Sequence, residues 1–232
     1  MTKYAKGFSG KMKKIISLKE AAAKVSNGMS VMIGGFISAG TPLGIIEELI
    51  QTGIGDLVLI ANDTGRKGQG IGKLVAAGLI KEAVVSHIGT NPETGRKMNA
   101  GEIKVHFVPQ GTLAERIRCA GAGIGGFLTP AGVGTAAAEG KPVVNLDGKE
   151  YLLEKGIKAD VALLKASIAD ESGNLFYNGT TRNFNPLMAL AADLVIAETD
   201  KIVAAGKLHR DHVMTPGILV DYICLSGVDA ND

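Results

Sequence analysis

The sequence lacks several features that mark particular classes of protein. It has no tryptophan, and aromatic residues make up only 4% of its 232 residues, too few for the stacked aromatic platforms that bind single-stranded nucleic acids. The formal net charge is only +2, and residues of both signs are scattered along the chain. A general basic surface for DNA or RNA is therefore excluded, and we expect no nucleic-acid partner.

The chain also lacks a long apolar run. No stretch of about 18 apolar residues predicts a membrane span, and no apolar core of a signal peptide follows the N-terminal lysines. The two cysteines, Cys119 and Cys224, lack metal-ligand spacing. We therefore expect a cytoplasmic protein without a metal site or a membrane partner. The one local excess of charge is predicted to be a solvated, loosely ordered N-terminus over residues 1–15, with Lys3, Lys6, Lys11, Lys13 and Lys14.

Apolar residues and glycine are abundant: 46% of the chain is hydrophobic and 32 residues are glycine. The apolar runs are continuous rather than alternating, which is typical of strands covered on both faces. Residues 1–232 are therefore predicted to form a single α/β domain, a mostly parallel open sheet with helices on both faces. The expected strands are 31–33, 57–60, 83–86, 105–108, 143–146, 161–165, 194–197 and 219–224. The expected helices are 21–25, 42–51, 73–77 and 112–118, the first preceded by a capping box at Ser17 and Glu20.

A glycine-rich loop between the strand at 31–33 and the helix that Pro42 opens is the first candidate site. Ligands of open α/β sheets bind where a strand ends and a loop leads into a helix. Glycines there let backbone amides approach a ligand closely, and the helix start favours an anion. The alternative is a tight turn with no ligand. The loop comprises Gly34, Gly35, Phe36, Ile37, Ser38, Ala39 and Gly40.

A second candidate is Gln110, which lies between the strand at 105–108 and the helix at 112–118. A side-chain amide at such a turn can donate a hydrogen bond into the crevice, as an oxyanion stabiliser must. The alternative is a surface glutamine beside a helix that Thr112 caps.

Gly121 to Gly126 fits the dinucleotide-binding pattern G-x-G-x-x-G. That pattern requires a strand before it and a helix after it, whereas here a helix precedes and Thr129-Pro130 follows. We therefore predict a long loop lined by backbone across the glycine-rich segment from Gly111 to Gly134.

Several segments together resemble the family I coenzyme A transferases, in particular the alpha subunit of the acetate, butyrate and acetoacetate branch. The resemblance covers about residues 16–225 in order. It is carried by the glycine loop with Pro42 and by residues 60–64, 87–95, 110–118 and 182–186. It implies transfer of coenzyme A from an acyl-CoA to a carboxylic acid by a ping-pong route. A glutamate attacks the thioester to give an acyl-glutamyl anhydride, and the CoA thiolate then forms a glutamyl-CoA thioester.

In that family the glutamate lies in a Ser-Glu-Asn-Gly motif on the beta subunit. No glutamate here has that context; the nearest string, Glu171-Ser172-Gly173-Asn174, has another order. The resemblance therefore implies that this chain is half of an enzyme, with a beta subunit as partner in an α2β2 assembly. Acyl-CoA and small carboxylic acids are then its substrates, and no tightly bound cofactor is expected.

Within this half, the resemblance implies that Gly34 to Gly40 contacts coenzyme A and that Gln110 donates to the thioester oxygen. Asn62, Asp63 and Thr64 either line the same crevice or form an Asx turn that supports the strand end. His87 is expected to be structural, because a carboxylate nucleophile needs no general base. Two other functions stay open: a sugar-phosphate isomerase or deaminase of similar fold, and a non-catalytic acyl-CoA-binding module.

Overall fold

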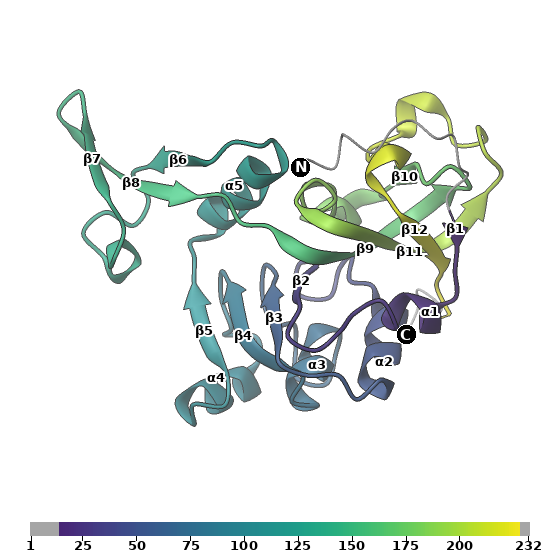
Figure 1. The fold of residues 1–232 in the computed structure, drawn as a ribbon, viewed down its shortest axis with the longest axis horizontal. Coiled ribbons are helices and arrows are strands. Elements are labelled where there is room, and N and C mark those ends of the chain that lie inside the picture. Colours follow the sequence, from purple (N-terminus) through teal and green to yellow (C-terminus); the bar gives the residue numbers. More distant parts are fainter. Residues whose placement is uncertain (1–13, 228–232) are drawn as a thin grey trace.

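The computed structural model describes residues 14–227. Within them, nine strands form one sheet in the order β1-β12-β11-β9-β2-β3-β4-β5, and β10 pairs with β9 outside this path. Neighbours along the path are parallel, and β10 runs antiparallel to β9 (Figure 1). The strands are β1 (Lys14–Ile15), β2 (Ser30–Ile33), β3 (Leu57–Ile60), β4 (Ile80–Val85), β5 (Lys104–Phe107), β9 (Ala159–Asp170), β10 (Leu175–Phe176), β11 (Ala192–Val203) and β12 (Tyr222–Leu225). The α-helices are α1 (Leu18–Ala22), α2 (Leu43–Gln51), α3 (Ile71–Ala76), α4 (Pro92–Asn99), α5 (Gln110–Gly121) and α6 (Asn185–Met188).

Helices cover both faces of this sheet, as predicted. Val31 and Leu163 face one core, which α1, α2 and α3 complete. Met32 and Leu164, the next residues along the same strands, face a second core with α5 and α6. Successive side chains of a strand point to opposite faces, so a buried residue at every position gives the continuous apolar runs of the sequence.

The expected helix starts are close to the observed ones. Ser17 and Glu20 form the predicted capping box, although α1 ends at Ala22, earlier than expected. Pro42 is the N-cap of α2 rather than its first helical residue. The amide of Ile45 in the first turn of α2 donates to the buried carboxylate of Glu198 on β11, 2.9 Å away.

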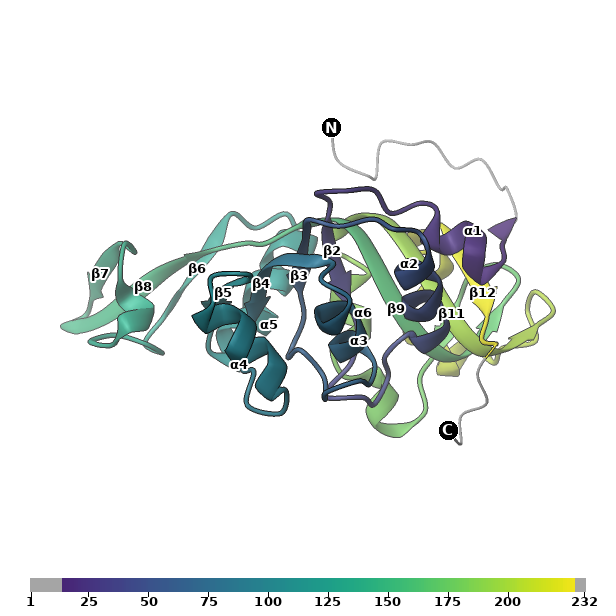
Figure 2. The same cartoon turned by 90° about the horizontal axis from the view of Figure 1, so that it is seen from below.

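A second, antiparallel sheet projects from the main body as an arm, in the order β6-β8-β7 (Figures 1 and 2). The strand expected at 143–146 is present, but it is β7 of this arm, and its Val143 is exposed. The predicted loop across Gly111 to Gly134 is wrong in part, because β6 lies within it. A Cβ at Gly126 would lie 2.5 Å from the carbonyl oxygen of Glu154, so glycine is needed where the two strands approach closely. The arm strands are β6 (Gly126–Thr129), β7 (Val143–Leu146) and β8 (Lys149–Lys155).

Lys14 and Ile15, expected within a loosely ordered N-terminus, instead pair in parallel with Tyr222 and Ile223 of β12. The expectation for the earlier lysines, Lys3 to Lys13, concerns residues outside the described range. Within residues 14–227, no helix has the length and apolar character needed to cross a membrane.

Candidate functional site

Polar loops gather along the edge of the sheet where the parallel strands end. β2 to β5 are neighbours in the sheet, so the loops that follow them lie side by side (Figure 1). The order of the strands reverses at β2, since the chain adds β3 to β5 on one side and β9 to β12 on the other. This is the place where open α/β sheets bind ligands.

The glycine loop after β2 closes into a tight hairpin turn. Phe36 and Ala39 exchange two backbone hydrogen bonds of 3.0 and 3.1 Å. Ile37 at the tip has a φ of 60°, a left-handed conformation that is strained for a β-branched residue. The amides of Ser38 and Gly40 make no hydrogen bond within residues 14–227. The turn therefore presents free backbone donors next to a strained residue.

The glycines of this loop are required by contacts within the chain. A Cβ at Gly34 would lie 1.8 Å from Oδ1 of Asn185, and one at Gly35, where φ is 133°, would lie 2.2 Å from Oγ1 of Thr41. The side chain of Asn185 donates to the carbonyl of Gly40, at 3.0 Å, and fixes the end of the loop. The sequence predicted either a ligand loop or a tight turn at these glycines, and neither interpretation included this role of Asn185. Asn185 lies within segment 182–186, one of those that carry the family resemblance.

Asp63 holds the tip of the glycine loop. Its Oδ2 accepts a hydrogen bond from the amide of Ile37 at 2.8 Å, and its Oδ1 accepts one from the amide of Gly65 at 2.7 Å. The second bond forms the Asx turn that was one of the two expectations for this segment. Asp63 is only 2% exposed, so it supports the loop from beneath.

Asn62 links the carboxylate of Asp63 to the side chain of Gln110 by hydrogen bonds. Asn62 is fully buried, and its Nδ2 donates to Oδ2 of Asp63 at 2.7 Å. Its Oδ1 accepts a 2.7 Å hydrogen bond from Nε2 of Gln110 and a 3.1 Å bond from Oγ of Ser86. A continuous polar line therefore runs from Ile37 through Asp63 and Asn62 to Gln110.

Gln110 lies at the carboxyl-end edge, as predicted, but it is the first residue of α5 rather than part of a turn before the helix. The helix does not use Thr112 as a cap, because Pro109 is the N-cap and the buried Oγ1 of Thr112 has no hydrogen-bond partner in the described part of the chain. The side chain of Gln110 is exposed. One of its two amide hydrogens is engaged by Asn62, and the other has no hydrogen-bond acceptor within residues 14–227.

His87 lies beside this network, next to Ser86. Its Nδ1 is 3.3 Å from Oγ of Ser86, and its backbone forms a single parallel bridge with Asp63. These contacts support the interpretation of His87 as structural.

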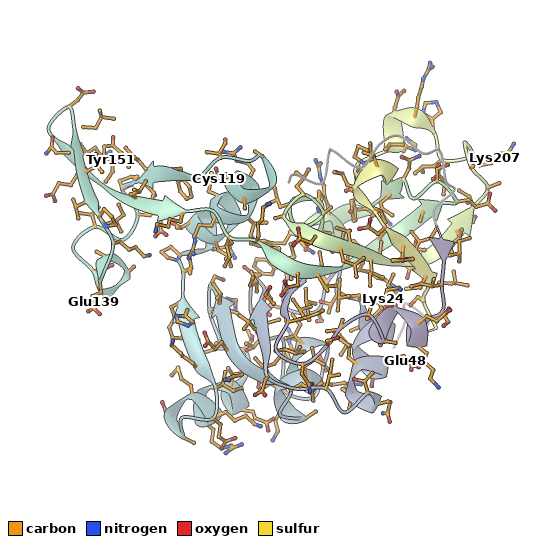
Figure 3. All side chains as sticks on the ribbon, viewed as in Figure 1. Lys24, Glu48, Cys119, Glu139, Tyr151 and Lys207 are labelled. Atoms are coloured by element: carbon orange, nitrogen blue, oxygen red, sulfur yellow. The ribbon has the colours of Figure 1, made fainter. Side chains whose placement is uncertain are left out.

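A cavity of about 680 Å³ opens between the end of β5, helix α5 and the loop that precedes β7. Ser86 and Pro109 line one side and link it to the polar network. Arg116 and Lys141 line it as well, and both also contact the buried carboxylate of Glu154, at 3.8 and 2.5 Å. Figure 3 shows the side chains of this region, with Glu139, another lining residue, on the arm.

Comparison with known proteins finds close relatives over nearly the whole chain. Residues 15–226 match the sequence model of the family described as Coenzyme A transferase. The acetate CoA-transferase subunit alpha of Escherichia coli K12 is 52% identical over 213 residues, which are 92% of this chain and 97% of that subunit. The acetoacetyl-CoA:acetate/butyrate CoA transferase alpha subunit of Clostridium acetobutylicum is 48% identical over 210 residues, with 90% and 96% covered.

The fold is shared with a solved structure of more distant sequence. An acyl-CoA transferase of Escherichia coli O157:H7 (YdiF), in a thioester complex with CoA, superposes with a TM-score of 0.81 at 22% identity. The match covers 92% of this chain and 50% of that one, so the present chain spans about half its length.

Proposed function

Because this chain belongs to the coenzyme A transferase family, we propose that it is the alpha subunit of an enzyme that transfers coenzyme A between short-chain carboxylic acids, such as acetate, acetoacetate and butyrate. The observation that carries the proposal is the 52% identity to an acetate CoA-transferase alpha subunit over almost the full length of both chains. The family assignment also argues against the sugar-phosphate isomerase alternative.

The proposed reaction uses a glutamate of a beta subunit, because no glutamate here lies in a Ser-Glu-Asn-Gly segment. Its carboxylate attacks the thioester carbon of the donor, CoA leaves as a thiolate, and an acyl-glutamyl anhydride forms. The thiolate then attacks the glutamyl carbonyl carbon, which releases the donor acid and leaves a glutamyl-CoA thioester. The acceptor acid passes through the same two steps in reverse and leaves as the new acyl-CoA.

Gln110 is proposed to donate its free amide hydrogen to the thioester oxygen as that oxygen gains negative charge. Its position at the carboxyl-end edge and its fixed hydrogen bond to Asn62 support this role. The glycine loop is proposed to bind coenzyme A through the free amides of Ser38 and Gly40. The cavity between β5, α5 and the arm is lined by Pro109, the residue before Gln110, and is proposed to hold part of the substrate.

The arm is proposed to contact the beta subunit in an α2β2 complex. The register of its strands places an apolar row on one face, and Leu146, at the end of β7, is 51% exposed. Figure 3 shows Tyr151, one member of this row, far from the main core. Such an apolar face is typical of a protein contact. The row consists of Leu128, Leu153, Tyr151, Val144 and Leu146. We further propose that the complex is cytoplasmic, which fits two buried cysteines that form no disulfide.

The test is reconstitution. The purified chain alone is expected to transfer no CoA from acetoacetyl-CoA to acetate, and addition of a beta subunit with a Ser-Glu-Asn-Gly segment is expected to restore turnover. Borohydride reduction of the thioester formed with acyl-CoA should mark a glutamate of the beta subunit. Turnover by this chain alone would overturn the proposal, and acyl-CoA binding without turnover in the two-chain complex would favour the non-catalytic binding module.

A further inference from the structure

We propose that Asn62 and Asp63 are positioning residues that fix the direction in which Gln110 presents its amide hydrogens. The proposal rests on the proposed role of Gln110 in the transfer reaction. It assigns to these two residues a function beyond the Asx turn at the end of β3.

The direction is set at Asp63. An ionised carboxylate only accepts hydrogen bonds. The carboxylate of Asp63 accepts from the amides of Ile37 and Gly65 and from Nδ2 of Asn62. The side-chain amide of Asn62 must therefore turn its nitrogen toward Asp63, and its Oδ1 must point the other way.

The oxygen of Asn62 in turn selects the nitrogen of Gln110. Oδ1 is an acceptor only, so Gln110 can bond to it through Nε2, at 2.7 Å, but not through Oε1. An unheld glutamine amide can exchange its oxygen and nitrogen by a half-turn about its last bond. The hydrogen bond to Asn62 prevents this exchange and leaves the second hydrogen of Nε2 in one fixed direction.

Burial makes this selection effective. Asn62 is fully buried and Asp63 is 2% exposed, so water does not compete for their hydrogen bonds, whereas Gln110 itself is exposed. Because the same Oδ2 also holds the amide of Ile37, one carboxylate sets both the tip of the glycine loop and the donor direction of Gln110.

The experiment is a double-mutant cycle on the complex with its beta subunit, with acetoacetyl-CoA and acetate as substrates. Asn62→Ala is expected to lower kcat by about ten- to a hundredfold, because a misplaced donor no longer meets the reacting oxygen, while KM changes by less than about threefold. Gln110→Ala is expected to lower kcat by about a hundredfold or more. The double variant should be no slower than Gln110→Ala alone, since Asn62 acts through Gln110.

Asn91→Ala is the matched control. Asn91 is also a fully buried asparagine at this edge, where it caps α4 and donates to the carbonyl of Thr64, but no hydrogen bond joins it to Gln110. Its loss should lower stability and leave kcat of the folded complex within about twofold. If Asn62→Ala does not fold, Asn62→Leu takes its place in the same cycle, because it keeps most of the side-chain volume and offers Gln110 no acceptor.

The outcomes separate the two proposals. Losses of Asn62→Ala and Gln110→Ala that multiply in the double variant would overturn the positioning role, as would an Asn62→Ala kcat equal to that of the parent. If Gln110→Ala itself keeps the parent kcat, the proposed role of Gln110 fails and the positioning role fails with it. A loss in Gln110→Ala without one in Asn62→Ala refutes the positioning role alone.

Discussion

The backbone amide of Ile37 donates a 2.8 Å hydrogen bond to the buried carboxylate of Asp63, and this bond holds a β-branched residue at a φ of 60°. A left-handed conformation of this kind costs a non-glycine residue about 1–2 kcal/mol. Strain of this kind is concentrated at functional sites. The contact is therefore the point at which the fold fixes the shape of the glycine loop.

Ile37→Gly should relieve this strain. We expect the free energy of unfolding to stay level or to rise by up to about 1 kcal/mol, since glycine adopts a positive φ without cost but gains freedom in the unfolded chain. kcat/KM should fall, because the loop is held less rigidly. The neighbouring Phe36→Gly, where φ is not positive, is the control and should lose stability. A loss of stability in Ile37→Gly as large as that in Phe36→Gly would contradict the assignment of strain.

Gly34→Ala should disrupt the contact with Asn185. The added methyl group would lie 1.8 Å from Oδ1 of Asn185, so the side chain that anchors Gly40 must move. We expect a loss of about 1–3 kcal/mol in the free energy of unfolding, measured by chemical denaturation. In the control Gly89→Ala, a Cβ meets no atom within 4 Å. Equal stability of the two variants would show that the close packing at Gly34 is not maintained in solution.

Gln110→Ala should affect the chemical step and leave the fold intact. Removal of the side chain deletes one hydrogen bond to the buried Oδ1 of Asn62, which keeps Ser86 as a donor, and is expected to lower the free energy of unfolding by about 0.5–1.5 kcal/mol. The loss of one oxyanion donor should lower kcat and kcat/KM together by about a hundredfold, roughly 3 kcal/mol. Steady-state kinetics of the reconstituted complex decide the matter: a kcat within about threefold of the parent means that Gln110 is not the donor.

Leu146→Lys should weaken the association with the beta subunit. Leu146 belongs to the apolar row of the arm, and a buried charge there is expected to raise Kd about tenfold or more, at least about 1.4 kcal/mol. Val143→Lys is a close control: Val143 is 52% exposed against 51% for Leu146, and it lies on the same strand but on the opposite face. Sedimentation or calorimetry with the beta subunit gives both constants. Equal weakening by the two variants would assign the contact to another surface.

Cys224 should make stability fall at alkaline pH. Burial, together with the nearby charge of Glu198, raises the pKa of this thiol to about 12. In the unfolded chain the thiol has a pKa of about 8.5, so above that pH the unfolded state binds fewer protons than the folded state. The thiol's contribution is therefore complete below pH 8.5 and declines above it by about 1.4 kcal/mol per pH unit. Denaturation at pH 7.5 and 9.5 should show a shallower decline for Cys224→Ala than for the parent, and identical slopes would refute the burial argument.

The local sequence was sufficient to predict the central strands and that both of their faces are covered. The runs at 31–33 and 57–60 correspond to β2 and β3 because strands buried on both faces need apolar residues at every position. The same signal misplaced residues 143–146, since a short apolar run carries no information about the sheet in which it pairs. β8 was not predicted, because its sequence, Lys-Glu-Tyr-Leu-Leu-Glu-Lys, has charged residues at both ends and only a short apolar run between them.

The sequence predicted that the candidate residues lie at strand ends, but it did not predict the hydrogen bonds between them. Gln110 and the glycine loop lie at strand ends, as expected, because the carboxyl ends of parallel strands share one edge. The bond between Gln110 and Asn62 joins residues 48 positions apart, and no local pattern marks such a pair. The contact between Gly34 and Asn185 likewise depends on the folded sheet, so the sequence showed a need for glycine without showing its cause.

The exposure of Gln110 has a consequence for thioester chemistry outside the assembled enzyme. An amide donor that is exposed to solvent forms its hydrogen bond with water. It also lacks the water-excluded, low-dielectric environment in which it would stabilise an oxyanion strongly. In the proposed reaction the nucleophile lies on a beta subunit, so we expect an unassembled copy of this subunit to hydrolyse no acyl-CoA. Division of the centre between two chains, as proposed, would thus confine the reactive glutamyl intermediate to the assembled complex.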